Sequence, residues 1–191
     1  MTARIAVLAS GGGSNLQAML DYFAGPGRDA GSIVWVGSNR VNAGALQRAS
    51  AAGVPVGIVH DPQDGDALLT ALRAVNADLL VLAGYLKLIP PAVVRAFRGR
   101  LLNVHPSLLP AFGGEGMYGM RVHEAVIASG AAFSGVTVHF VDEEFDRGAI
   151  IAQTTVAVRA DDTPATLAAR VLQAEHDLLP RTVAKVIELS T

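Results

Sequence analysis

Asn103 and His105 are the side chains whose types and spacing most directly suggest chemistry. They lie in the segment LLNVHPSLLP, where an apolar run reaches a polar tip and Pro106, which has no N–H to donate, ends any regular continuation. Side chains alternate along an extended strand, so residues two apart point to the same side. An amide and an imidazole together at the end of a buried strand could polarise a carbonyl and move a proton. The alternative is a strand end with a capped turn.

Asp146 is the carboxylate that we expect beside His105. It belongs to an acidic connection, DEEFD, that follows the alternating segment GVTVHFV, and most of these carboxylates are expected to be solvated. Arg147 and Gly148 come next, where the chain must turn and can aim one carboxylate inward. A carboxylate near an imidazole raises its pKa and fixes its tautomer. The sequence therefore predicts a proton-transfer and carbonyl-polarising site.

The other histidines receive less weight. His139 alternates in phase with Thr137 and Val141, so we expect it to be packed and hydrogen-bonded, with a possible supporting role. His60 and His123 are expected to be surface or structural residues. A Ser-His-Asp hydrolase is disfavoured because the chain has no G-x-S-x-G motif. A metal site is disfavoured because His105, His139 and Asp146 lack the usual ligand spacing, and we expect no metal.

A glycine-rich turn, SGGGSN at residues 10–15, lies between the first expected strand and the first expected helix. Glycines let the backbone approach a ligand, and a helix N-terminus offers free N–H groups to an anion. The dinucleotide fingerprint is incomplete because Leu16 replaces its third glycine, and no G-K-[ST] motif is present. We therefore expect a small phosphorylated molecule and no nucleotide cofactor. A tight turn without a ligand is the alternative.

Apolar runs alternate with amphipathic segments through the first 105 residues, which predicts an α/β fold. We expect a single-domain, Rossmann-like, doubly wound, mostly parallel sheet with an antiparallel element near the C-terminal part. The domain would span 1–191, with a phosphate-binding half at about 1–100 and a catalytic half at about 101–191. Strands are expected at 4–9, 32–37, 54–59, 77–83, 101–105, 135–141 and 149–158. Helices are expected at 14–24, 43–52, 66–75, 91–97, 122–129 and from 164 onward, with a mobile loop at 111–120.

Composition limits the classes of function. The chain has 191 residues, 51% of them hydrophobic, a formal net charge of −2 and no cysteine. Disulfides and thiolate chemistry are therefore excluded. No basic stripe predicts binding to nucleic acid, and no apolar run is long enough to cross a membrane. The N-terminus shows no signal-peptide pattern. We expect a cytoplasmic protein that acts on small molecules, with no nucleic-acid or membrane partner, as a monomer or homodimer.

Taken together, these motifs resemble those of the glycinamide ribonucleotide formyltransferases of purine synthesis. The resemblance runs from about Ile5 to Pro180 and rests on SGGGSNLQAM, VLAGYLKLI, NVHPSLLPAF, GVTVHFVDEEFDRGAII and RVLQAEH. It implies that 10-formyltetrahydrofolate is the co-substrate and that the amine of glycinamide ribonucleotide accepts the formyl group. It also implies that Asn103, His105 and Asp146 are the catalytic residues.

The resemblance further implies where each substrate binds. Phosphoribosylglycinamide would contact Gly13, Ser14, Asn15, Gly114 and Glu175. The folate would contact Leu86, Lys87, Leu88, Ile89 and Asn103.

The chain departs from the family pattern at several positions. Phe112-Gly113-Gly114 stands where an aromatic-Pro-Gly sequence is common, which should loosen the loop. Lys87 stands where many members have arginine, and an arginine early in the third helix has no counterpart here. We therefore expect side-chain contacts to the distal part of the folate to differ from the family pattern.

Three rival functions follow from the same motifs. Formyltetrahydrofolate deformylase has a similar trio but uses water as acceptor, and it usually has an extra N-terminal domain. Methionyl-tRNA formyltransferase adds a C-terminal tRNA-binding domain. We expect neither addition in this chain. A non-catalytic phosphosugar-binding protein is the rival from a different class.

Overall fold

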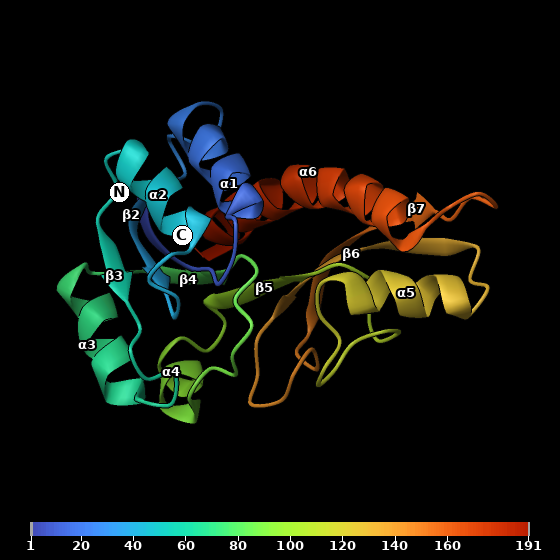
Figure 1. The fold of residues 1–191 in the computed structure, drawn as a ribbon. Helices are drawn as coiled ribbons and strands as arrows, with labels where there is room; N and C mark the ends of the chain where they lie inside the picture. Colours follow the sequence, from blue (N-terminus) through green and yellow to red (C-terminus); the bar gives the residue numbers. More distant parts are fainter. Residues whose placement is uncertain (1, 191) are drawn as a thin grey trace.

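A computed structural model describes residues 2–190 of the chain, and a seven-stranded sheet forms its centre (Figure 1). The strands lie in the order β3-β2-β1-β4-β5-β6-β7. Strands β1 to β5 pair in parallel, whereas β6 pairs antiparallel with both β5 and β7. The predicted fold class, mostly parallel with an antiparallel element near the C-terminal part, is therefore confirmed. The strands are β1 (Ala3–Leu8), β2 (Gly31–Ser38), β3 (Val56–Ile58), β4 (Leu79–Leu82), β5 (Leu101–His105), β6 (Phe133–Phe140) and β7 (Ile150–Ala157).

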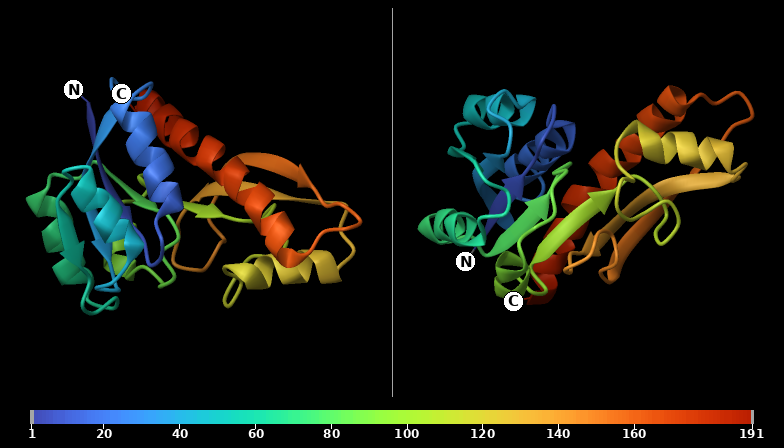
Figure 2. Two further views of the ribbon diagram at one scale, coloured as in Figure 1. Left: turned by 45° about the horizontal axis from the view of Figure 1, so that its top comes forward. Right: turned by 60° about the horizontal axis from the view of Figure 1, so that its bottom comes forward.

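Helices cover both faces of the sheet (Figure 2). Alternate residues of β1 separate the two faces: Ile5 and Val7 pack with α1, α2 and α6, whereas Ala6 and Leu8 pack with α3 and α4. The β4 strand is fully buried, as expected for a parallel strand covered on both sides. The helices are α1 (Ser14–Ala24), α2 (Gly44–Ala51), α3 (Gly65–Ala74), α4 (Pro91–Ala96), α5 (Met120–Ala128) and α6 (Pro164–Ser190).

The long helix α6 runs across one face of the sheet from β7 to α1. It begins where the sequence predicts, because Thr163 caps it by accepting a hydrogen bond from the backbone N–H of Thr166 at 3.2 Å. Leu167, Val171 and Leu179 form its buried face in the same core as α1 and α5. In Figure 1, α6 lies above β6 and β7, with its C-terminal end beside α1. It therefore connects the N-terminal and C-terminal parts of the structure.

The topology produces a switch point between β1 and β4. From β1 the chain proceeds outward through β2 and β3, and from β4 it proceeds outward in the other direction. Ligands of open α/β sheets bind at the carboxyl ends of strands beside such a point. The glycine-rich turn follows β1 there, and its Ser10 hydroxyl accepts a hydrogen bond from the N–H of Leu86 after β4, at 3.0 Å. Residues 10–15 and 84–89 are therefore adjacent.

Within residues 2–190, no helix combines the length and the apolarity needed to cross a bilayer.

Candidate active site

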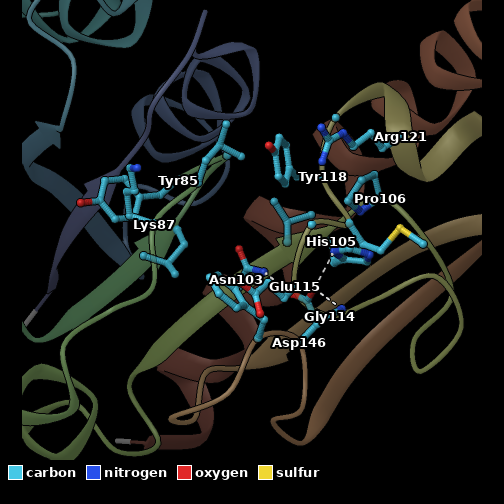
Figure 3. Close-up of a pocket in the computed structure, with 18 of the residues that line it drawn as sticks. Tyr85, Lys87, Asn103, His105, Pro106, Gly114, Glu115, Tyr118, Arg121 and Asp146 are labelled. Atoms are coloured by element: carbon cyan, nitrogen blue, oxygen red, sulfur yellow. Dashed lines mark hydrogen bonds and ion pairs between the residues drawn. The ribbon is translucent and has the colours of Figure 1, made fainter. Parts of the chain in front are cut away.

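A cleft of about 650 Å³ opens along β4 and β5, and the predicted catalytic residues line it (Figure 3). The segment 84–89 after β4 lines one part of the cleft, and the loops that follow β5 and β6 line the middle. Residues of α5 and α6 complete it. The cleft therefore contains surfaces contributed by segments far apart in the sequence.

Strand β5 gives Asn103 and His105 their common direction. Leu102 and Val104 pack into the core beneath α6, so the alternating residues Asn103 and His105 face the opposite side of the sheet. Strand β6 is in register with them, and Asn103 is paired directly with His139. One amide and two imidazoles therefore gather on this face.

Asp146 reaches the same group from the loop after β6. Its backbone has φ of 57°, a left-handed conformation that turns the chain, as the following Arg147-Gly148 led us to expect. Its Oδ2 lies 3.4 Å from Nδ1 of His105, and its Oδ1 lies 3.4 Å from Nδ2 of Asn103. The N–H of Gly114 donates to Oδ2 at 3.0 Å. The structure therefore brings Asn103, His105 and Asp146 together.

His105 lies between two oxygen acceptors. Its Nε2 is 2.8 Å from the carbonyl oxygen of Phe112, and its Nδ1 faces the carboxylate of Asp146. Burial lowers the pKa of His105, and this effect outweighs the opposite influence of Asp146 and the Phe112 carbonyl. The free site thus favours the neutral ring, yet both nitrogens have an acceptor ready if a second proton arrives.

Asp146 is kept ionised by its neighbours. Burial alone would raise the pKa of Asp146, but contacts with His139, the electrostatic influence of His105 and the N–H of Gly114 lower it below its ordinary value. Only 9% of the side chain is exposed. A buried, ionised carboxylate therefore lies beside the imidazole of His105.

His139 supports this arrangement from β6. Its Nδ1 donates to the carbonyl oxygen of Phe140 at 2.7 Å, which leaves Nε2 facing Nδ2 of Asn103 at 3.1 Å. In the neutral ring, Nε2 accepts a hydrogen bond from the Asn103 amide. The packed, hydrogen-bonded state predicted for His139 is thus observed, and the ring helps to orient Asn103.

The glycine-rich turn has the features of an anion site. Gly13 is the N-cap of α1, with φ of 76°, no side chain caps the helix, and its first turn contains no acidic residue. Its free N–H groups and positive dipole end are therefore available to an anion. Arg48 donates from Nε to the carbonyl oxygen of Gly12 at 2.8 Å and thereby brings a cation to the turn. Ser14 is part of the same first helical turn.

Asn15 connects this turn to the cleft. Its Nδ2 donates to Oε2 of Glu175 in α6, and both side chains are buried. The Nδ2 group of Asn15 is therefore already engaged, whereas its backbone N–H is available and its Oδ1 is buried without a partner among residues 2–190. Burial raises the pKa of Glu175 to about 7, although the hydrogen bond from Asn15 opposes the shift. Glu175 lines the cleft together with Gly114.

The segment after β4 forms an apolar wall of the cleft. Ile89 is buried, Leu86 is 40% exposed, and Leu88 is intermediate between them. Figure 3 shows Lys87 and Tyr85 on this side of the cleft, away from Arg121. The apolar side chains of this wall suit a flat aromatic ligand.

Several cleft residues were not predicted from the sequence. They come from α5 and from the two loops near it: Met117, Tyr118, Arg121, His123 and Phe145. Of the two histidines expected to be surface or structural residues, His60 is exposed, whereas His123 is 5% exposed and lines the cleft. The sequence does contain an indication that His123 is buried, because the apolar residues Val122 and Val126 lie near it at helical spacing.

Among residues 2–190, no group of three or more histidine or acidic side chains is arranged to hold a metal ion.

Known proteins with similar sequences and structures include formyltransferases. Residues 3–183 match the formyl transferase family model. The chain is 45% identical over 192 residues to a chloroplastic phosphoribosylglycinamide formyltransferase of Arabidopsis thaliana, covering 97% of this chain and 65% of that protein. The chain thus spans about two thirds of this relative's length.

Two solved structures agree closely with the fold. Glycinamide ribonucleotide transformylase 1 of Symbiobacterium toebii is 39% identical with a TM-score of 0.90, covering 98% of this chain and 88% of that one. Phosphoribosylglycinamide formyltransferase of Brucella melitensis is also 39% identical, with a TM-score of 0.88, covering 98% and 96%. The match over nearly the whole chain shows that the protein belongs to the formyl transferase family.

Proposed function

We propose that this protein transfers the formyl group of 10-formyltetrahydrofolate to the amine of glycinamide ribonucleotide. The observation that carries the proposal is the placement of Asp146 against both His105 and Asn103, in a cleft that adjoins an anion-binding turn. Relatives and solved structures named for this reaction support the choice of substrates.

The acceptor substrate would lie between the glycine-rich turn and the catalytic residues. Its phosphate would take the N–H groups of Gly13, Ser14 and Asn15 at the start of α1. The glycinamide part would reach past Glu175 and Gly114, which line the cleft near Asp146. The hydrogen bond between Asn15 and Glu175 fixes the distance between these two ends.

The formyl donor would lie on the opposite side of His105. Its pterin would rest against Leu86, Leu88 and Ile89, with backbone groups of the same segment recognising its polar edge. Lys87, which is exposed, would remain available to the anionic end of the folate. The formyl group would then lie beside Asn103.

The chemistry follows from the groups around the reacting carbon. The acceptor nitrogen bonds to the formyl carbon, and the C–O double bond opens to an oxyanion that Asn103 stabilises. Neutral His105 takes up the proton of the acceptor nitrogen, and the imidazolium that forms stabilises the oxyanion once its Nε2 has exchanged the Phe112 carbonyl for the substrate. The proton lost by the acceptor nitrogen passes through His105, or a water that it holds, to the folate nitrogen. The bond from carbon to that nitrogen then breaks, and the carbonyl re-forms.

Asp146 makes this proton transfer possible. Burial disfavours a charged His105 in the free site, but the ionised carboxylate 3.4 Å away stabilises the imidazolium when it forms. Groups of this kind typically contribute about 10²–10⁴ in rate each.

Folate turnover by purified protein, with and without glycinamide ribonucleotide, tests the proposal. We expect release of tetrahydrofolate only when the acceptor is present. Equal release without acceptor would indicate a deformylase that uses water. Binding of the phosphorylated acceptor with no turnover would indicate a non-catalytic phosphosugar-binding protein. Both outcomes would contradict the proposal.

The proposal extends to the location, oligomeric state and cofactor needs of the protein. We expect a cytoplasmic enzyme, a single domain over 1–191, monomeric or homodimeric, that needs no metal, nucleotide cofactor, nucleic acid or membrane. Size measured in solution and activity after treatment with a chelator would test the oligomeric state and the metal independence.

A further inference from the structure

His123 is a buried, cleft-lining histidine for which the proposed chemistry has no use. It lies in α5 between Val122 and Val126, which are both buried, and only 5% of it is exposed. The cleft wall nevertheless includes it. A buried polar side chain normally has a hydrogen-bond partner, so its surroundings need an explanation.

Neither ring nitrogen of His123 has a hydrogen-bond partner within residues 2–190. Nδ1 is completely buried without one, whereas Nε2 has no bond but is not completely buried. A neutral imidazole has one N–H and one lone pair. The proton can reach an acceptor only at Nε2, because Nδ1 is enclosed by the protein. The ring therefore presents an N–H donor that a ligand in the cleft can use.

Electrostatics keep this ring neutral. Burial lowers the pKa of His123, and the nearby His105 lowers it further. Any proton that His105 gains during the reaction therefore disfavours a second charge on His123. The His123 ring therefore stays an uncharged hydrogen-bond donor, and it does not oppose protonation of His105.

The position of α5 indicates which substrate the donor would meet. Figure 3 shows Tyr85 and Lys87, from the segment after β4, on one side of Asn103, and Arg121, from the first turn of α5, on the far side of His105. Helix α5 packs against α6, which provides Glu175 and its link to Asn15 at the anion turn. His123 and Glu175 thus line the same cleft from two helices that pack together, and Glu175 is hydrogen-bonded to Asn15 at the anion turn.

We infer that His123 binds the acceptor substrate by donating a hydrogen bond from Nε2 to a carbonyl or hydroxyl oxygen of glycinamide ribonucleotide. The oxygen would belong to the glycinamide or ribose part, between the phosphate and the reacting amine. This inference rests on the function proposed above. It makes His123 a residue that selects and orients the acceptor, with no part in proton transfer.

Three substitutions at this position separate the two ring nitrogens. In His123→Gln the amide nitrogen can occupy the place of Nε2, whereas in His123→Asn it can occupy the place of Nδ1. His123→Leu has similar bulk and no polar atom. His60→Leu, at an exposed histidine outside the cleft, is the matched control. Circular dichroism and thermal unfolding establish which variants are folded.

Glycinamide ribonucleotide is then titrated into each protein by calorimetry without folate, and KM is measured for both substrates. We expect His123→Leu to weaken acceptor binding roughly fivefold to twentyfold, as loss of one hydrogen bond would. The KM for the folate and the pH dependence of kcat should stay unchanged. His123→Gln should recover most of the affinity. His123→Asn should bind the acceptor as weakly as His123→Leu does, and His60→Leu should bind it as tightly as wild type.

Unchanged acceptor affinity in His123→Leu would overturn the inference, as would a change confined to the folate KM. Recovery by Asn and not by Gln would also overturn it, because that result would place the contact at Nδ1. If His123→Leu does not fold, the comparison of Gln with Asn decides. If wild-type protein binds the acceptor but transfers no formyl group, the proposed function fails while the calorimetric test of His123 still applies. If wild type does not bind the acceptor, both fail.

Discussion

Oδ2 of Asp146 lies 3.4 Å from Nδ1 of His105, although His105 is the last residue of β5 and Asp146 lies in the loop after β6. The same carboxylate also contacts Asn103 and the N–H of Gly114. Asp146 therefore links the imidazole, the amide and the loop after β5. A change in this one carboxylate should affect the whole site.

Replacing Asp146 by asparagine should reduce kcat by about 10²–10⁴ because the imidazolium of His105 would lose its counter-charge. The shape of the side chain is kept, so the far-ultraviolet circular dichroism spectrum should match that of wild type. Glu143→Gln in the same loop is the control, since Glu143 is exposed and contacts only Arg95 among the described residues. Full activity in Asp146→Asn would exclude the assigned role.

The two glycines of the anion turn should respond differently to alanine. A Cβ at Gly13 would lie 2.6 Å from Cα of Ala45, and the residue has φ of 76°, so Gly13→Ala should cost roughly 2 kcal/mol or more of folding free energy. A Cβ at Gly12 would meet nothing within 4 Å, so Gly12→Ala should stay within about 1 kcal/mol of wild type. Urea unfolding measures both. Equal stability of the two variants would argue against the packing of this turn on α2.

Glu175 should make stability depend on pH. Its pKa is about 7 in the folded protein against an ordinary value of 4.5, so the folded state holds the proton more tightly than the unfolded state. The stabilisation is therefore fully present below about pH 4.5 and is lost as pH rises through 7. Relative to Glu175→Gln, wild type should lose on the order of 3 kcal/mol across this range.

Chemical unfolding of both proteins between pH 4.5 and 8 checks this prediction. Other groups that change protonation over this range are present in both proteins and cancel in the difference. A difference in stability that does not change with pH would show that Glu175 has an ordinary pKa.

Tyr85 should tolerate loss of its hydroxyl group. Burial raises the pKa of Tyr85 to about 12, and the hydroxyl is buried without a partner among residues 2–190. Removing an unpaired buried hydroxyl should leave stability unchanged or raise it by about 1 kcal/mol. Thermal unfolding of Tyr85→Phe provides the measurement, and a clear loss of stability would indicate that the hydroxyl has a partner in solution.

Local patterns predict most of this fold because the helices carry an apolar stripe and the central strands are short apolar runs. Helix α1 begins and ends at the predicted residues, Ser14 and Ala24. Its buried apolar residues, Leu16, Met19, Leu20 and Phe23, form one stripe along the helix that the sequence pattern reveals. Other boundaries differ by one or two residues, as at α5, which begins at Met120 instead of Val122. Boundaries depend on capping and loop contacts that a hydrophobic pattern does not contain.

The site depends on contacts between distant segments, and these were only partly predictable. The motifs indicated Asn103, His105 and Asp146, but the register that pairs β5 with β6 places His139 opposite Asn103, and no local pattern specifies it. Asn15 was expected at the phosphate, yet its side chain contacts Glu175. Such partners are set by tertiary packing.

Mass spectrometry of the acceptor, after incubation with 10-formyltetrahydrofolate carrying a carbon-13 formyl group, tests the central claim most directly. We predict that wild-type protein places the labelled carbon on the amine of glycinamide ribonucleotide, and that Asp146→Asn does so at least a hundredfold more slowly. Labelled formate in place of labelled product, or equal rates for the two proteins, would contradict the account.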